Sequence, residues 1–276
     1  MLAQRTRSFR HAVLRFTLPC LLVLTTYGAM LVAPVAEAHR HAEGLHLVRI
    51  VANDNGKDNK DFRGSYSMPT QVPTGLVEIK FFNVGHQDHM ATFFLLKKGV
   101  SEALFLQRLA AVANTMDPAK EVVALKALLA IASAAGGANS ITTGNEQDVI
   151  ERLRPGHYVA VCFDTTSDGV AHFERGMAKG FFASDNAKAP VTNDVAPSDG
   201  TVLEFDHQIN VPQVITQYRP LLLKVVVLDQ THELGLLRVP DGTTKEDLLK
   251  CFTGPPSACP LKSPPVDAGG AAAIAP

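Results

Sequence analysis

The 276-residue sequence contains no tryptophan, only four cysteines and no surplus of charge of either sign. Its net charge at pH 7 is −1, which gives no basic footprint for nucleic acid. It has no phosphate-binding loop, nucleophile elbow, zinc-protease helix or Cys-x-x-Cys pair. Only one hydrophobic run, near the N-terminus, approaches the length of a membrane span. These absences leave no sequence signature of an enzyme and no nucleic-acid partner.

The N-terminus is typical of an export signal. Four arginines precede a hydrophobic run, Thr17–Val35, and Ala36-Glu37-Ala38 follows as a cleavage pattern for signal peptidase. We therefore predict that residues 1–38 are a signal peptide and that the rest of the chain is periplasmic or secreted. An uncleaved membrane anchor is the alternative, because the run is close to the length that crosses a bilayer.

Three cysteines follow the predicted cleavage site, and an odd number leaves at least one of them unpaired. Cys251 and Cys259 flank a Gly-Pro-Pro turn and are candidates for a disulfide. Cys162 is then a lone thiol in an oxidising compartment. Metal ligation is one explanation for it, and burial as a small hydrophobic residue is the other.

Short strand-like segments separated by turns follow the N-terminal region. Residues 77–83 alternate as a half-buried strand does, whereas residues 90–96 are apolar on both faces. The other predicted strands are 45–52, 147–153, 158–163 and 181–183. Because the strands do not alternate regularly with helices, we expect a mainly β protein with an antiparallel Greek-key β-sandwich.

A change of hydrophobic period between residues 101 and 135 predicts a pair of helices inserted between two strands. Ser101 is placed to cap the first helix, and Asp117-Pro118 starts the second, with proline where its missing N–H costs nothing. Gly136-Gly137 is expected to end it.

The C-terminal part repeats features of the preceding domain. His232 and the residues after it follow the course of His89 and its successors at an offset of 143 residues. We therefore predict a first domain over 39–184, a linker over 185–200, and a partial second repeat over 201–276 that ends in a disordered tail. A half sandwich exposes an edge, so we expect it to pack on the first domain, to mediate self-association or to stay partly disordered.

Four candidate ligands of three residue types occur in an order that suggests a metal site. Asn83 and Gly85 precede a histidine at the end of a strand, and a later strand ends at a cysteine, followed by a histidine and, five residues on, a methionine. The candidate ligands are His89, Cys162, His172 and Met177. This order resembles the cupredoxin family of blue copper proteins over residues 70–184, and more weakly over 201–250.

The resemblance implies a cupredoxin-like sandwich that binds one copper ion. A thiolate and two imidazoles hold the ion in a plane, and a thioether makes a weak axial contact. It also implies one-electron transfer to a redox partner protein, with the edge of His172 facing solvent. Nine residues separate Cys162 from His172, more than in familiar carriers. The turn-rich stretch 164–169 either loops out and returns His172 to the site or holds it away.

Other interpretations remain open for the same residues. Cys162 is alternatively a buried structural thiol, His89 caps a loop, and Met177 fills space in the core. In that case the sandwich would be a metal-free binding module for another exported protein. A His-rich mature terminus beginning at His39, together with Met90, would suit copper storage or delivery to an acceptor. The histidines cannot assemble the trinuclear cluster of a copper oxidase. His86 is a spare candidate ligand.

Overall fold

The computed structural model describes residues 45–192, 200–205, 208–210, 223–227, 232–253, 258–263 and 265–274. The predicted signal peptide over 1–38 and the His-rich segment at His39 lie outside these residues. Within the described part, no helix is long and apolar enough to cross a membrane.

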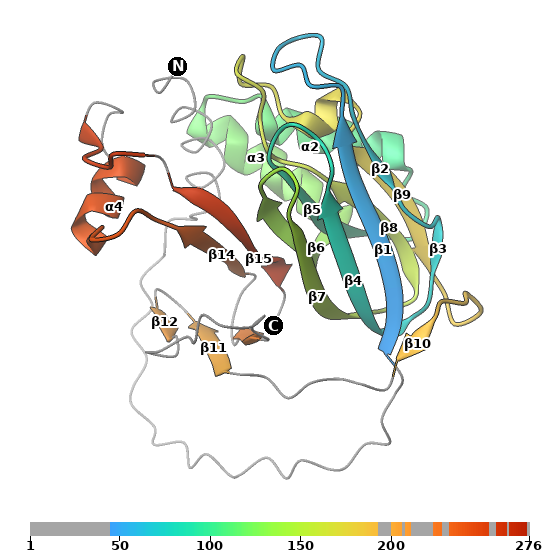
Figure 1. Ribbon diagram of the computed structural model, residues 1–276. Coiled ribbons are helices and arrows are strands. Elements are labelled where there is room, and N and C mark those ends of the chain that lie inside the picture. Colours follow the sequence, from blue (N-terminus) through green and yellow to red (C-terminus); the bar gives the residue numbers. More distant parts are fainter. Residues whose placement is uncertain are drawn as a thin grey trace, which may run out of the picture.

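Two facing sheets form the body of the protein (Figure 1). The first contains β10 (Val191–Thr192), β1 (Leu45–Asp54), β4 (Gly75–Asn83) and β7 (Glu146–Leu153) in that order, with β2 (Gly64–Ser67) paired to β1. The second runs β14 (His232–Arg238), β15 (Val266–Ile274), β6 (Ala132–Ile141), β5 (His89–Leu96), β8 (Gly156–Val161), β9 (Ala178–Ala183) and β3 (Gln71–Val72). The predicted mainly β sandwich is confirmed.

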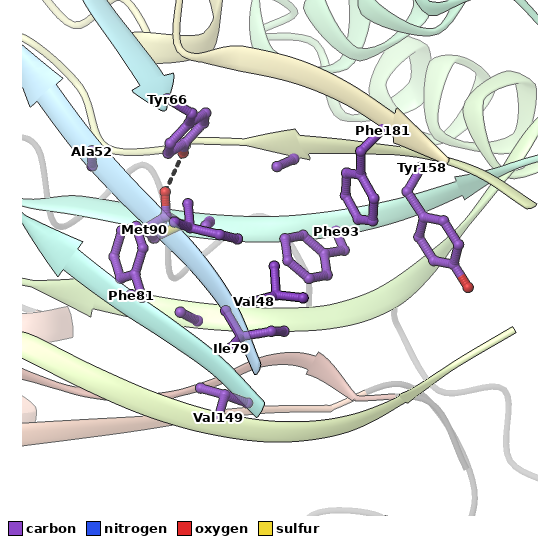
Figure 2. Packing of buried hydrophobic residues seen from close by; sticks show 14 of the residues in the cluster. Val48, Ala52, Tyr66, Ile79, Phe81, Met90, Phe93, Val149, Tyr158 and Phe181 are labelled. Atoms are coloured by element: carbon purple, nitrogen blue, oxygen red, sulfur yellow. Dashed lines mark hydrogen bonds between the residues drawn. The ribbon is translucent and has the colours of Figure 1, made fainter. Parts of the chain in front are cut away.

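Alternating side chains fill the space between the two sheets. Ile79 and Phe81 of β4 point inward from the first sheet toward Phe93 of β5 and Phe181 of β9 (Figure 2). The Tyr66 hydroxyl, also buried, donates a hydrogen bond to the Met90 backbone carbonyl and so satisfies its polar atom inside this core. The core therefore joins β2 to β5 close to the start of β5, where His89 lies.

The second sheet is buried on its outer face as well. Helices α2 (Glu102–Ala113) and α3 (Pro118–Leu129) lie between β5 and β6 in the chain, and Phe105 and Leu109 of α2 pack on Phe94 of β5. Residues 90–96 are apolar on both faces for this reason. The predicted caps are confirmed, because Ser101 accepts from the Leu104 amide and Asp117 accepts from amides of the α3 first turn.

Two expectations differ from the structure. Gly136-Gly137 does not end the second helix; it lies inside β6, because the chain leaves α3 after Leu129 and re-enters the sheet at Ala132. The sheets are also mixed rather than antiparallel, since β1 pairs in parallel with β4. Between β1 and β4 the chain forms β2 in the first sheet and then β3 in the second sheet. This crossover lets β4 run in the same direction as β1.

The C-terminal part is attached to the sandwich through one strand. Strand β15 pairs antiparallel with β6 and with β14, so residues 266–274 form a strand where the sequence predicts a disordered tail (Figure 1). A separate sheet contains β12 (Gln208–Asn210), β11 (Gly200–Phe205) and β13 (Leu223–Val227). Helix α4 (Lys245–Thr253) connects β14 to β15, and the Cys251–Cys259 disulfide is present as predicted.

The pairing of β14 with β15 parallels that of β5 with β6. Gly235 faces Gly270 as Thr92 faces Gly137, and Leu234 faces Ala271 as Ala91 faces Ala138. Gly137 and Gly270 both have positive φ, and a Cβ on them would lie 2.0 Å from the Ala91 carbonyl oxygen and 1.8 Å from the Leu234 carbonyl oxygen, respectively. These correspondences support the predicted partial repeat, which stays a prediction because the described residues do not trace the whole unit.

Gly137 and Glu151 form a tight contact between the two sheets. Gly137 has φ +115°, and a Cβ there would lie 2.0 Å from the Ala91 carbonyl oxygen. Its amide donates to one carboxylate oxygen of Glu151, whereas the other oxygen is buried without a hydrogen-bond partner among the described residues. Burial raises the pKa of Glu151 to about 7.

We predict that Gly137→Ala lowers the free energy of unfolding by about 3 kcal/mol, because it combines left-handed backbone strain with a backbone clash. Gly144→Ala is the matched control: Gly144 also has positive φ, 79°, but a Cβ there meets nothing within 4 Å. It should cost only about 1 kcal/mol. Urea unfolding measures both, and equal losses would contradict the close approach at Gly137.

We predict that Glu151→Gln removes a pH-dependent loss of stability. The pKa of Glu151 is raised from 4.5 to about 7, so the folded state binds a proton that the unfolded state releases between these values. Relative to the variant, the wild type should lose about 1.4 kcal/mol of unfolding free energy per pH unit across this interval as pH rises, with no further change above it. A pH-independent difference between the two urea-unfolding series would refute this.

Candidate metal centre

Three of the predicted ligands meet at one end of the sandwich. His89 begins β5, Cys162 follows β8 directly, and His172 begins the short 3-10 helix His172–Arg175. The Cys162 sulfur lies 3.5 Å from Nδ1 of His172 and 3.8 Å from Nδ1 of His89, and the two Nδ1 atoms are 3.3 Å apart. All three side chains are buried. We call this set the His-Cys-His triangle.

The size of the triangle fits a single metal ion. The centre of a triangle with sides of this length lies about 2 Å from its corners, which is close to a metal–nitrogen or metal–sulfur bond. One soft sulfur and two imidazole nitrogens are the donors that trigonal copper sites use. The donor set therefore supports one copper ion.

Asp54 at the end of β1 contacts the His89 ring. Its Oδ2 atom lies 2.9 Å from Nε2 of His89, and backbone amides hold the pKa of Asp54 at about 2 although burial raises it. The carboxylate is therefore ionised and accepts a hydrogen bond from Nε2–H. The Nδ1 atom of His89 is left with its lone pair facing Cys162 and His172, as a ligand requires.

Burial keeps both imidazoles neutral near pH 7. It lowers the pKa of His172 to about 3, with a smaller contribution from His89. Burial also lowers the pKa of His89, although Asp54 acts in the opposite direction. Burial and the neighbouring Asp164 raise the pKa of the Cys162 thiol, and a bound cation would reverse this because it favours the thiolate.

Met177 lies beside the triangle and is fully buried. Its backbone amide donates to the His172 carbonyl over 3.0 Å, and its carbonyl accepts from the Cys162 amide over 3.1 Å. A Cβ on Gly64 of β2 would lie 2.5 Å from the Met177 sulfur, so a glycine leaves the room that this side chain occupies. These contacts hold Met177 next to both Cys162 and His172.

The long stretch between Cys162 and His172 loops out and returns, the first of the two predicted possibilities. Thr165 and Ala171 form an isolated β-bridge at its base, and the His172 amide donates to the Asp164 carbonyl over 2.8 Å. The extra residues therefore do not separate the two side chains.

The expectation that the His172 edge faces solvent is wrong, because His172 is 1% exposed. The Phe62 ring stacks on its imidazole with 4.2 Å between ring centroids. Residues 55–63 after β1 contact the Cys162–His172 loop, where the Ser167 amide donates to Asp58 over 2.7 Å. We call residues 55–63 the cover segment, because they cover the His172 ring and separate it from solvent.

Arg175 connects the cover segment to the Cys162–His172 loop through hydrogen bonds. Its guanidinium donates to the Asn59 carbonyl, to the Thr166 hydroxyl over 2.7 Å and to both oxygens of Asp168, over 3.0 and 2.7 Å. Arg175 also holds the pKa of Asp168 at about 2, so this ion pair persists at all ordinary pH values.

The remaining predicted histidines do not join the triangle. His86 lies at the surface with 69% of its side chain exposed and contacts Asp54 rather than Cys162. His232 lies on β14, and His39 is outside the described residues. Sequence reasoning missed Asp54, Phe62 and Arg175 as parts of the site. No local pattern marks them, because each is defined by contacts with distant segments.

No family model and no curated protein matches the chain. Solved structures that resemble it include reduced auracyanin from Roseiflexus castenholzii, with 18% identity over 50% of this chain and 97% of that one, at a TM-score of 0.31. Rusticyanin from Thiobacillus ferrooxidans is 16% identical over 50% of this chain and 78% of that one, at 0.29.

A multi-copper oxidase from Pseudomonas thermotolerans is also similar, with 7% identity over 58% of this chain and 33% of that one, at a TM-score of 0.28. Likeness at these levels carries no argument about activity. The predicted resemblance to cupredoxins is confirmed by the two-sheet sandwich together with the His-Cys-His triangle at its end.

We predict that Arg175→Met loosens the cover segment and speeds reaction of Cys162 with a thiol reagent about tenfold in the metal-free protein, since it removes hydrogen bonds to a charged group. A Cys20→Ser background leaves Cys162 as the free thiol, because Cys251 and Cys259 are paired. Lys80→Met, which removes a surface cation on β4, should leave the rate unchanged. Equal rates in all three proteins would rule out this fastening role.

Proposed function

We propose that this chain is an exported copper protein that transfers one electron at a time through a type 1-like site. The observation that carries the proposal is the His-Cys-His triangle, in which a thiol sulfur and two imidazole nitrogens lie within 3.3–3.8 Å of one another in the interior. No enzymatic step is required of the described residues, and the proposed role is that of a carrier.

The proposed ligands are His89, Cys162 and His172, with Met177 as a weak axial contact. Copper bound there would supply a one-electron couple between Cu(I) and Cu(II). The protein supplies a rigid donor set held by two strand ends and a short 3-10 helix, two imidazoles that stay neutral, and a site closed to water by the cover segment. Small rearrangement between oxidation states is the expected benefit of such rigidity.

We also propose the compartment in which the protein acts and the kind of partner it meets there. The N-terminal pattern Ala36-Glu37-Ala38 supports export, which would place the chain in the periplasm or outside the cell, where a redox protein is the proposed partner. We propose residues 39–184 as the copper domain, 185–200 as a linker, and 201–276 as a partial second repeat.

Copper storage or delivery is the second candidate function. It is favoured by one observation: His172 is buried under Phe62 instead of offering an edge to a partner. A closed site suits slow exchange of the ion with a copper donor or acceptor. Reversible electrochemistry of the copper-loaded protein would favour electron transfer, and its absence together with transfer of Cu(I) to an acceptor would favour storage.

We predict an intense visible thiolate-to-copper band when one equivalent of Cu(II) is added to the full chain. Cys162→Ser should abolish the band, because an alcohol is not a thiolate donor, and it should weaken copper binding strongly. Cys20→Ser is the control and should keep the band. A folded, colourless wild type would refute the type 1-like site.

A further inference from the structure

We propose that Asp54 is the positioning residue of the copper site and that it holds His89 in the tautomer and orientation needed for ligation. This inference rests on the proposed function, because it concerns the same site. It adds a residue from a strand that contributes no ligand.

Asp54 is tied down by the surrounding backbone. Its side chain is fully buried at the end of β1. One oxygen accepts from the Gly56 amide over 2.6 Å, and the other accepts from the His86 and Gln87 amides over 2.7 and 3.1 Å. The carboxylate can therefore hardly rotate, and its bond to Nε2 of His89 has a fixed direction.

The chemistry around Asp54 requires a carboxylate. The backbone neighbours within hydrogen-bond distance are donors, as is Nε2–H of His89, and an ionised carboxylate accepts from all of them. An asparagine amide would turn its NH₂ toward at least one of these donors and leave it unpaired. A negative charge behind the ring also makes Nδ1 a stronger donor to a metal, which favours Cu(II) over Cu(I).

Gly85 supplies independent evidence that this contact is built into the fold. A Cβ on Gly85 would lie 2.4 Å from Oδ2 of Asp54 and 2.7 Å from Nε2 of His89. The backbone thus passes directly over the hydrogen bond and leaves no room for a side chain. Gly85→Ala offers a second way to disturb the contact without changing either partner.

The exposed ring of His86 provides the control. Its Nδ1 atom lies 3.2 Å from the other Asp54 oxygen, on the side away from His89. His86→Ala removes the exposed imidazole that contacts Asp54. It keeps the hydrogen bonds of Asp54 to the backbone amide of residue 86 and to the His89 ring. Asp148→Asn, at the surface of β7, controls for the loss of one carboxylate elsewhere.

The test has a metal-free and a copper-loaded readout on the full chain. In the metal-free wild type, nitrogen NMR of the imidazoles should show His89 protonated on Nε2 alone, and both Asp54→Asn and Gly85→Ala should give mixed tautomers. With copper, both variants should bind Cu(II) about 10- to 100-fold more weakly in a chelator competition and should have more positive reduction potentials. His86→Ala and Asp148→Asn should match the wild type in every readout.

The outcomes separate the two claims. If the wild type takes up no copper, the proposed function fails, while the tautomer measurement still decides the role of Asp54. If the wild type binds copper but both Asp54→Asn and Gly85→Ala keep its tautomer, affinity and potential, the positioning role is overturned. If Asp54→Asn does not fold, Gly85→Ala alone decides, because its side chains at the site are unchanged.

Discussion

Removal of water from the three donor atoms of the His-Cys-His triangle is the constraint on which the rest of the structure depends. His89, Cys162 and His172 face one another inside the protein, so their polar atoms lack the solvent that would otherwise satisfy them. Nε2 of His172 has no hydrogen-bond partner among the described residues. Burial keeps both imidazoles uncharged and the thiol protonated, and a cation held by the triangle would favour the thiolate.

The sandwich provides the rigidity that this arrangement needs. His89 and Cys162 lie at the ends of neighbouring strands, β5 and β8, whose sheet is packed on both faces. The helical insertion covers the outer face, and the first sheet covers the inner one. Packed strands therefore place two of the candidate ligands, His89 and Cys162. His172 lies on the short 3-10 helix, and hydrogen bonds and Arg175 hold the cover segment and the Cys162–His172 loop.

The main structural effect of the C-terminal part is at one edge of the sandwich and not at the His-Cys-His triangle. Strand β15 pairs with β6, which would otherwise be an open edge of the second sheet. It also brings Asp267 near Asp164, and repulsion among these acids, added to burial, raises the pKa of Asp164. Acidic side chains from both sides of the predicted linker thus lie near one another close to Cys162.

The sequence alone determined features encoded over a few residues: strands such as 77–83 and 90–96, the Ser101 and Asp117 caps, the candidate Cys251–Cys259 pair and the order of the candidate ligands. Periodicity, capping and turn signals act locally, so a single sequence reveals them. Only the tertiary structure decided that Gly136-Gly137 sits within a strand. The same is true of contacts between distant residues: the parallel pairing of β1 with β4, the bond from His89 to Asp54 35 residues away, and the closure over His172 by a segment 109 residues from Ser167. These depend on how packed strands bring separate segments together, which no local pattern records.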